Sequence, residues 1–203
     1  NKKIVMSNQN IQKIGVMVDF SINDNILITS GLKISSSFNT ELCLIYYPGN
    51  KIPDSDAEQK LEQALQKLNK QVPGIQAAYL FPNGSKHEIA ALLADDYEII
   101  LVIVNIEHYR YYSAAVTHSP IPFLFINTHQ INTSFKSIVL PVDLRKGISD
   151  AAMWGSYFGR YINSEITVIA ANQNGKTEQK EVDKNVIRIK KLMHKFNIKH
   201  KIY

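Results

Sequence analysis

Two aspartates follow apolar runs in similar surroundings. Asp19 ends the run 16–18 and Asp143 ends the run 139–142. If these runs are strands, each carboxylate lies at the carboxyl end of a strand, where open α/β sheets bind ligands. Alternatively, an aspartate there accepts hydrogen bonds from loop N–H groups or caps the next helix. The residue types favour this structural role for Asp19 and leave both roles open for Asp143.

Other patterns that carry chemistry do not occur. His108, His118 and His129 show neither HxxxH nor HExxH spacing, so the sequence predicts no metal site. There is no GxSxG elbow of a serine hydrolase and no GxxxxGK(S/T) phosphate loop. Cys43, the sole cysteine, falls within an apolar run, so we expect a small buried side chain and no intramolecular disulfide.

An internal repeat organises the chain. Residues 13–50 align with residues 137–174 at a constant offset of 124, without a gap. The matches include Val18 with Val142, Asp19 with Asp143, Gly31 with Gly155, Asn39 with Asn163 and Glu41 with Glu165. Because this period is far longer than that of solenoid repeats, each copy is predicted to be a domain.

Apolar runs alternate with helical periodicity along both copies. The expected strands are 13–20, 41–47, 75–81, 98–104 and 122–127, then 137–143, 165–171 and 199–203. The expected helices are 21–37, 54–72, 85–94 and 108–118, then 149–162 and 177–196. We expect Ser21 to cap the first helix and Ile22 to face the core.

The alternation predicts an α/β fold, a three-layer sandwich with a parallel five-stranded sheet covered by helices on both faces. The predicted domains are 1–127 and 137–203, joined by a linker at 128–136. The second copy holds only a βαβαβ unit. Since its sheet would have an open edge, we expect the natural protein to continue past Tyr203 or, less favoured, another chain to cover that edge.

Composition and charge exclude several classes of protein. Hydrophobic residues make up 45% and charged residues 20% of the 203 residues, as in globular proteins. The longest apolar runs, 89–94 and 99–104, are far shorter than the roughly 20 residues of a membrane span. Together with the single cysteine and an N-terminus lacking a secretory signal, this favours a cytoplasmic protein without a membrane partner.

Basic residues gather near the end of the chain. Residues 128–203 contain 13 lysines and arginines against 6 acidic residues, whereas residues 1–127 contain 10 against 12. The basic stretch 176–201 is either a nucleic-acid-binding surface or the solvated face of an amphipathic helix. We favour the solvated face, so a nucleic-acid partner is not expected.

The order of these segments resembles the universal stress protein family. The resemblance rests on residues 16–19 with 41–47 and on residues 139–143 with 165–171, and it extends over nearly the whole chain. The second copy is closer, because Pro141-Val142-Asp143 matches a form frequent in the family. The resemblance implies a tandem universal stress protein, incomplete in its second domain, with strand order 3-2-1-4-5 and both aspartates at the switch point of the sheet.

Some family members bind ATP. In those, the resemblance implies that the aspartate after the first strand contacts the nucleoside and that a small residue after the second strand flanks the adenine. A loop G-x2-G-x9-G-(S/T) after the fourth strand holds the phosphates, because glycines let backbone N–H groups approach them.

The two copies match this pattern differently. The first has Asp19, but Tyr47 would block adenine or stack on it, and residues 105–113 contain no glycine. We therefore expect no nucleotide in the first domain. The second has Asp143 and the small Ala171 at the matching positions, while its glycine loop would follow Tyr203.

An aromatic cluster at 108–112 suggests a contact surface. Arg110 can serve as a charged anchor and Tyr111 can supply contact area at an interface. Alternatively, Tyr109, Tyr112 and Val116 pack inward at helical spacing. We favour core packing combined with an interface.

The sequence therefore favours a non-enzymatic stress-response module for binding and interaction. By the resemblance, its domains would pair through the fifth strands or the chain would self-associate as a homodimer, and it would bind an unidentified protein without a cofactor. The alternative is an ATP-binding switch or slow ATPase with its site in the second copy. Nucleic-acid binding through residues 176–201 ranks third.

Overall fold

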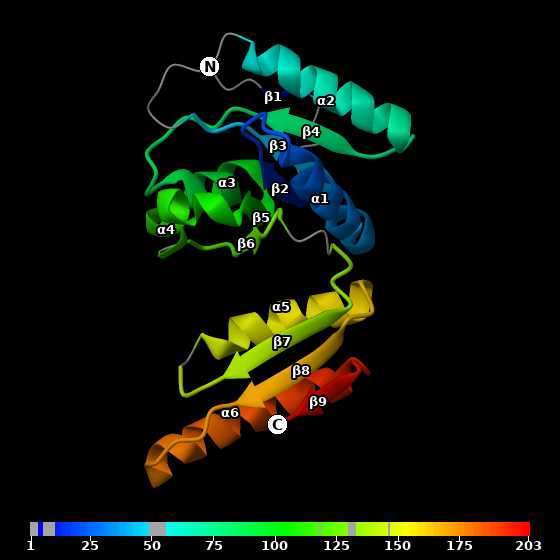
Figure 1. Ribbon diagram of the computed structural model, residues 1–203. Coiled ribbons are helices and arrows are strands. Elements are labelled where there is room, and N and C mark those ends of the chain that lie inside the picture. The colour runs from blue at the N-terminus through cyan, green and yellow to red at the C-terminus, as the bar shows by residue number, and fades with distance from the viewer. Residues whose placement is uncertain (1–3, 6–10, 49–55, 118, 130–132, 146) are drawn as a thin grey trace. The chain divides into compact units, whose positions relative to one another are not determined.

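The computed structural model describes residues 4–5, 11–48, 56–117, 119–129, 133–145 and 147–203 (Figure 1). The chain divides into two compact units, residues 1–133 and residues 134–203. We call them unit 1 and unit 2 and describe each by itself.

Unit 1 is built on a six-stranded sheet. Its strands are β1 (Ile4–Val5), β2 (Lys13–Met17), β3 (Glu41–Ile45), β4 (Ala77–Leu80), β5 (Ile99–Asn105) and β6 (Phe123–Ile126). The order β4-β3-β2-β5-β6 is parallel throughout, which confirms the predicted order 3-2-1-4-5. The short β1 adds an antiparallel edge beside β4 that the sequence analysis missed, because two residues show no periodicity.

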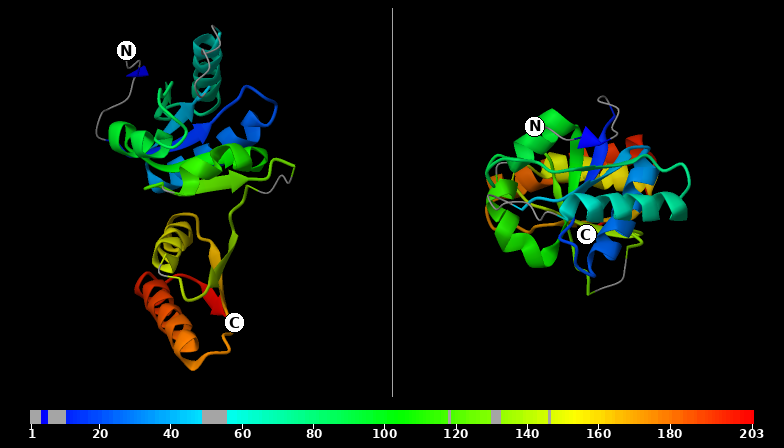
Figure 2. Two further views of the ribbon diagram at one scale, coloured as in Figure 1. Left: turned by 90° about the vertical axis from the view of Figure 1, so that its left-hand side faces the viewer. Right: turned by 90° about the horizontal axis from the view of Figure 1, so that it is seen from above.

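Helices cover both faces of this sheet (Figures 1 and 2). They are α1 (Asp24–Phe38), α2 (Ala57–Gln71), α3 (Ile89–Tyr97), the 3-10 helix η1 (Ile106–His108) and α4 (Tyr109–Thr117). Gly31 of α1 lies against Val16 and Leu42, whereas α3 and α4 pack on the side of Met17 and Cys43. Because neighbouring strand residues point to opposite faces, every residue of β2 and β3 is buried.

The turn after β2 differs from the prediction. The strand ends at Met17, and α1 begins at Asp24 with Asn23, not Ser21, as its N-cap. The Asp24 carboxylate accepts the N–H of Phe20 at 2.8 Å, and Phe20 takes a left-handed conformation with φ 63°. This turn delays the helix, so Ile22 is 87% exposed and does not reach the core as expected.

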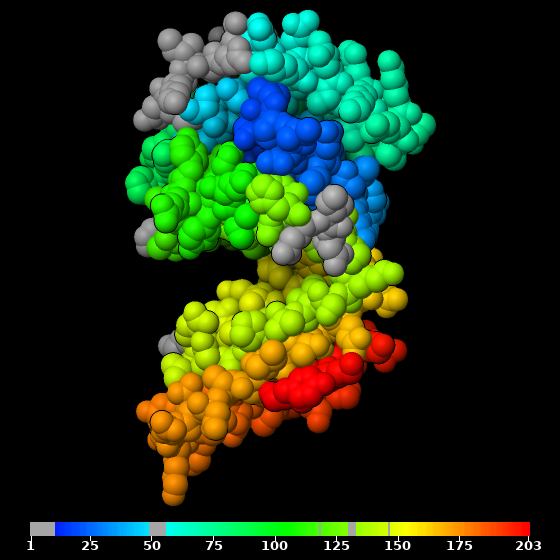
Figure 3. Space-filling view, viewed as in Figure 1, coloured from blue at the N-terminus to red at the C-terminus, as the bar shows by residue number. Residues whose placement is uncertain are grey.

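Unit 2 has a three-stranded parallel sheet in the order β7-β8-β9. Its elements are β7 (Ser137–Val142), α5 (Ile148–Tyr161), β8 (Glu165–Ala170), α6 (Lys176–Lys195) and β9 (His200–Ile202). Both helices lie on one face, over a core that includes Leu140 and Val168 (Figure 2). On the other face the atoms of the three strands lie at the surface in Figure 3, and there Val139 and Ile169 are 57% and 46% exposed.

The two copies of the sequence repeat have the same secondary structure. The strands β2 and β3 and the strands β7 and β8 begin 124 residues apart. The helices α1 and α5 also begin 124 residues apart, and both are followed by a left-handed asparagine, Asn39 with φ 55° and Asn163 with φ 60°. The same β-α-β arrangement is therefore present in both units.

None of the helices in the described part of the chain is long and apolar enough to cross a membrane.

Candidate functional site

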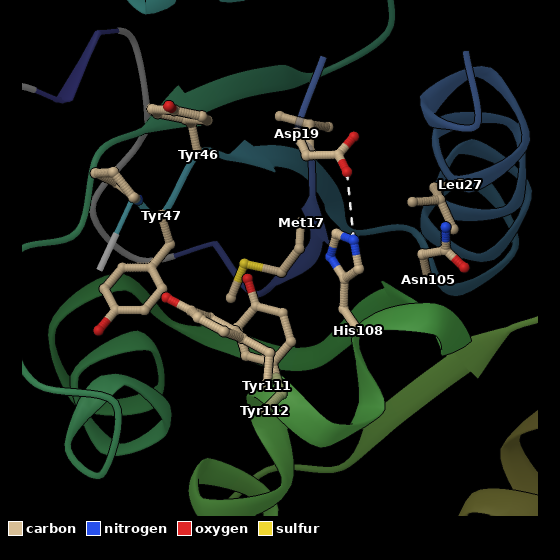
Figure 4. A pocket seen from close by; sticks show the side chains of 11 residues that line it. Met17, Asp19, Leu27, Tyr46, Tyr47, Asn105, His108, Tyr111 and Tyr112 are labelled. Carbon is tan, nitrogen blue, oxygen red and sulfur yellow. Dashed lines mark ion pairs between the residues drawn. The ribbon is translucent and has the colours of Figure 1, made fainter. Parts of the chain in front are cut away.

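A cavity of about 490 Å³ opens at the carboxyl ends of β2, β3 and β5 (Figure 4). It is lined by Met17, Val18, Asp19, Leu27, Tyr46, Tyr47, Pro48, Asn105, His108, Tyr111 and Tyr112. Its volume lies within the range of about 300–1,000 Å³ that is typical of small-molecule sites. The cavity is therefore large enough for a small organic ligand.

An aspartate and a histidine face each other in this cavity. Because β2 and β5 are parallel neighbours, the residues that follow them meet at one edge of the sheet. His108 Nε2 lies 3.4 Å from Asp19 Oδ2 (Figure 4). The other oxygen, Asp19 Oδ1, accepts the N–H of Ser21 at 2.9 Å. Asp19 thus holds its own loop and presents one oxygen toward His108.

Two neighbouring carboxylates have opposite pKa shifts. Burial favours a higher pKa for Asp19, but hydrogen bonds from Ser21 and the nearby His108 outweigh it and lower the pKa below its usual value. Burial, followed by the charge of Asp19, raises the pKa of Asp24 to about 7. Near neutral pH, Asp19 therefore carries the negative charge and Asp24 is partly protonated.

Four tyrosines give the cavity its aromatic lining. Tyr111 and Tyr112 meet edge to face, with ring centroids 4.9 Å apart. The buried Tyr47 donates its hydroxyl to the carbonyl of Gly84 at 2.9 Å. Burial raises the pKa of Tyr47, Tyr111 and Tyr112, so these phenols stay protonated.

The end of β5 passes directly into a helix. The Asn105 side chain accepts the N–H of Glu107 at 3.2 Å and donates to its carboxylate at 3.0 Å. The hydrogen bond from His129, followed by that from Asn105, lowers the pKa of Glu107. A negative charge and an internal cap therefore stand where the ATP-binding pattern requires a glycine loop.

The structure brings together three of the predicted site residues. Asp19, Tyr47 and Tyr111 line the same cavity. Arg110 is exposed on α4 and is not among the lining residues. Tyr109 is 53% exposed, against the inward packing considered for it, and its ring lies edge to face with that of Phe125, with the centroids 5.2 Å apart.

The matching residues of unit 2 are also close together. The N–H of Ala171 donates to the carbonyl of Val142 at 2.8 Å, which places Ala171 beside Asp143. Asp143 Oδ1 accepts the N–H of Arg145 at 2.9 Å, as Asp19 accepts that of Ser21. Its Oδ2 lies 2.7 Å from Arg145 Nε, so this carboxylate is paired with its own loop.

Sequence reasoning missed His108, Asn105 and Tyr112 as lining residues. A signal was present, since the order 3-2-1-4-5 makes the first and fourth strands neighbours and brings the residues after each together. Spacing along the chain bears on the histidines only as metal ligands, and the cluster at 108–112 indicates a contact surface without pointing to Asp19. Among the described residues, no group of three or more His, Cys, Asp and Glu could hold a metal ion.

Comparison with known proteins yields structural likeness alone. No protein-family model matches the chain, and no curated protein matches it. A universal stress protein from Archaeoglobus fulgidus DSM 4304 is similar, with TM-score 0.62 and 16% identity over 96% of this chain and 78% of that chain. A protein assigned to the same family from Pseudomonas aeruginosa UCBPP-PA14 has TM-score 0.59 and 14% identity, covering 96% of this chain and 74% of that one.

Proposed function

We propose that this chain, whose fold is that of the universal stress proteins, is a tandem member of that family and acts as a non-enzymatic stress-response module. In this proposal unit 1 binds no nucleotide through a phosphate loop, and the chain works by binding a ligand or a protein partner. Because the similar structures share only 14–16% identity with this chain, the site rather than the fold supports the functional part of this proposal.

The start of η1 carries the proposal. Phosphates bind at helix N-termini because free N–H groups and the helix dipole favour negative charge. Here the Asn105 side chain already occupies the N–H of Glu107, and the Glu107 carboxylate lies beside it. A phosphate placed there would meet a like charge and lose a hydrogen-bond donor.

Calorimetric titration of ATP into the native chain tests this part. We expect no binding that depends on unit 1, so any heat should be the same in the Asp19→Asn variant. A loss of ATP affinity in that variant would contradict the proposal. Asp143→Asn, the matched change in unit 2, serves as the control.

The edge strand β6 supports self-association. It ends the described sheet beside β5, and all four of its residues, Phe123–Ile126, are half-buried. An apolar strand at a sheet edge is a template for pairing with another strand. We propose that β6 of a second copy pairs with it.

Light scattering across a concentration series tests the pairing. The native chain should form a dimer, and Leu124→Lys should shift it to monomer. Gln63→Lys places the same charge on the exposed side of α2 and should leave the dimer intact. A native monomer at all concentrations would contradict the pairing.

The alternative is an ATP-binding switch or slow ATPase that uses unit 2. Asp143 and Ala171 lie side by side at the ends of β7 and β8, and Arg145 lies next to them. An arginine can pair with a phosphate. If the ATP titration shows binding that Asp143→Asn abolishes and Asp19→Asn preserves, this alternative replaces the non-enzymatic function.

A further inference from the structure

We propose that the cavity of unit 1 binds a small organic cation with an aromatic body. The ligand's ammonium would face the Asp19 carboxylate, and its body would lie among the tyrosine rings. This inference rests on the proposed function in one respect, that the cavity does not hold a nucleotide.

The charged residue in the lining of the cavity favours cations over anions. Asp19 is the charged acid in the lining, and none of the described lining residues is lysine or arginine. Glu107 adds a second negative charge at the start of η1, and its pKa is lowered. A low-dielectric cleft lined by one sign of charge concentrates ligands of the opposite sign.

The aromatic lining is suited to an ammonium group. Cations bind over the faces of tyrosine rings because of the ring quadrupole, as in aromatic cages for quaternary ammonium ligands. Four tyrosines, Tyr46, Tyr47, Tyr111 and Tyr112, line this one cavity. Lys86 Nζ lies 3.6 Å from the centroid of the Tyr111 ring, so a tyrosine of this lining already contacts an ammonium, which also places one positive charge beside the cavity.

The polar groups leave one main acceptor for the ligand. The Tyr47 hydroxyl is used by Gly84, and the Asn105 amide is used by Glu107. Asp19 Oδ2 faces His108 at 3.4 Å, longer than the typical N–H···O distance of about 2.7–3.2 Å. Asp19 also forms hydrogen bonds with the side chains of Ser21 and Asp24, so the contact with His108 is the loose one that a ligand ammonium can replace.

Three probes with one ring system separate charge from shape. Tryptamine is cationic, tryptophol is neutral and indole-3-acetate is anionic, and each can be titrated into the native chain by calorimetry at neutral pH. We expect tryptamine to bind most tightly, tryptophol at least about tenfold more weakly, and indole-3-acetate not at all, since hydrogen bonds to charged groups contribute about 1.5–3 kcal/mol. Equal or tighter binding of the anion would overturn the proposal, and so would absence of tryptamine binding.

Matched variants locate the probe. Asp19→Asn keeps an oxygen for the Ser21 N–H but removes the charge, and it should weaken tryptamine about tenfold or more. Asp143→Asn makes the same change in the same turn of unit 2, outside this cavity, and should leave the affinity unchanged. Tyr111→Phe should bind like the native chain and Tyr111→Leu more weakly. Equal tryptamine affinity in Asp19→Asn and the native chain would overturn the assignment.

Failure of this inference is distinguishable from failure of the proposed function. If tryptamine does not bind and ATP does not bind unit 1, only the ligand class is wrong. If ATP binds in an Asp19-dependent manner, the proposed function is wrong as well.

Discussion

The two units share one β-α-β arrangement but differ in how their sheets are covered. In unit 1 every residue of β2 and β3 is buried, because helices pack on both faces. In unit 2 both helices lie on one face, and strand residues alternate between buried Leu140 and exposed Val139. A parallel strand is therefore buried on both faces only where the rest of the fold supplies the second helical layer.

The same difference separates the two strand-end aspartates. Asp19 and Asp143 form the same turn with the N–H group two residues later. Asp19 also faces groups from η1 and α4, which follow β5 and line the cavity. The shared β-α-β arrangement thus supplies the carboxylate, and the second half of unit 1 turns it into a site.

The largest expected difference between the units concerns pH. Asp24 of unit 1 is matched at offset 124 by the apolar Ile148 of unit 2. Because burial and Asp19 raise the pKa of Asp24 to about 7, its protonated form stabilises the folded state. The stability of unit 1 should therefore fall as pH rises from the unfolded pKa of about 4 through about 7.

The sole cysteine and the sole tryptophan allow each unit to be followed separately. Cys43 is buried in unit 1, and its labelling in urea, scaled to the fully unfolded chain, reports unfolding there. The fluorescence of Trp154 reports unfolding of unit 2. Asp24→Asn should flatten the pH dependence of Cys43 labelling and leave that of Trp154 unchanged. A slope as steep in Asp24→Asn as in the native chain would assign the pH dependence to another group.

The next largest effect concerns two matched glycines. A Cβ on Gly31 would lie 2.4 Å from Val16 Cγ2 and 2.9 Å from Leu42 Cδ1. A Cβ on Gly155 would meet only Met193 Cε at 4.0 Å. Gly31→Ala should destabilise unit 1 by about 2 kcal/mol through overpacking, whereas Gly155→Ala should stabilise unit 2 by up to about 1 kcal/mol.

Urea unfolding with the same two probes measures these changes. The two variants are each other's control, because both place alanine at the same position of matched helices. Similar effects in both units would show that α1 and α5 pack against their sheets equally closely, contrary to the contacts of Gly31.

The sequence was sufficient to predict the parallel α/β class and the repeat, because long apolar runs and their alternation with helices are local signals. The strand order was implied by the resemblance to the universal stress protein family. It failed at the turn after β2. The left-handed Phe20 and the late start of α1 depend on the Asp24 side chain reaching back to the backbone. The apolar periodicity does not encode such a hydrogen bond, and it therefore predicts that Ile22 faces the core.

The candidate site was predictable only in part. Asp19, Tyr47 and Tyr111 came from position relative to the expected strands and from the aromatic cluster. His108 was missed in this role because its partner lies 89 residues earlier, and only the meeting of β2 with β5 joins them. The size and aromatic character of the cavity likewise depend on side-chain packing, which spacing along the chain does not encode.

A smaller effect of pH on folding stability is expected at the matched residues Glu41 and Glu165. Its direction is opposite in the two units. Glu41 is buried beside Lys13, its Oε2 has no hydrogen-bond partner among the described residues, and burial raises its pKa. Its contribution to stability is present below about pH 4 and is lost as pH rises through the raised pKa. Hydrogen bonding to Lys201 lowers the pKa of Glu165, so its contribution is present above about pH 4 and is lost as pH falls.

Unfolding in urea at several pH values, followed by Cys43 labelling for unit 1 and by Trp154 fluorescence for unit 2, tests this contrast. Glu41→Gln should remove a decline of unit 1 stability with rising pH. Glu165→Gln should lower the stability of unit 2 at neutral pH, and the difference from the native chain should vanish in acid. If both glutamates changed the stability of their unit with pH in the same direction, the result would contradict the burial of Glu41.

The smallest expected effect is the loss of stability when a left-handed asparagine is replaced, and it should be equal in the two units. Asn39 and Asn163 follow α1 and α5 in the left-handed conformation, with φ 55° and 60°. Asparagine tolerates this region better than alanine, whose Cβ is strained there by about 1–2 kcal/mol. Asn39→Ala and Asn163→Ala should each destabilise their own unit by about 1 kcal/mol in urea, and glycine at either position should restore stability. Because these turns depend only on the local backbone, an unequal loss would mean that the missing helical layer of unit 2 also changes the shared β-α-β arrangement.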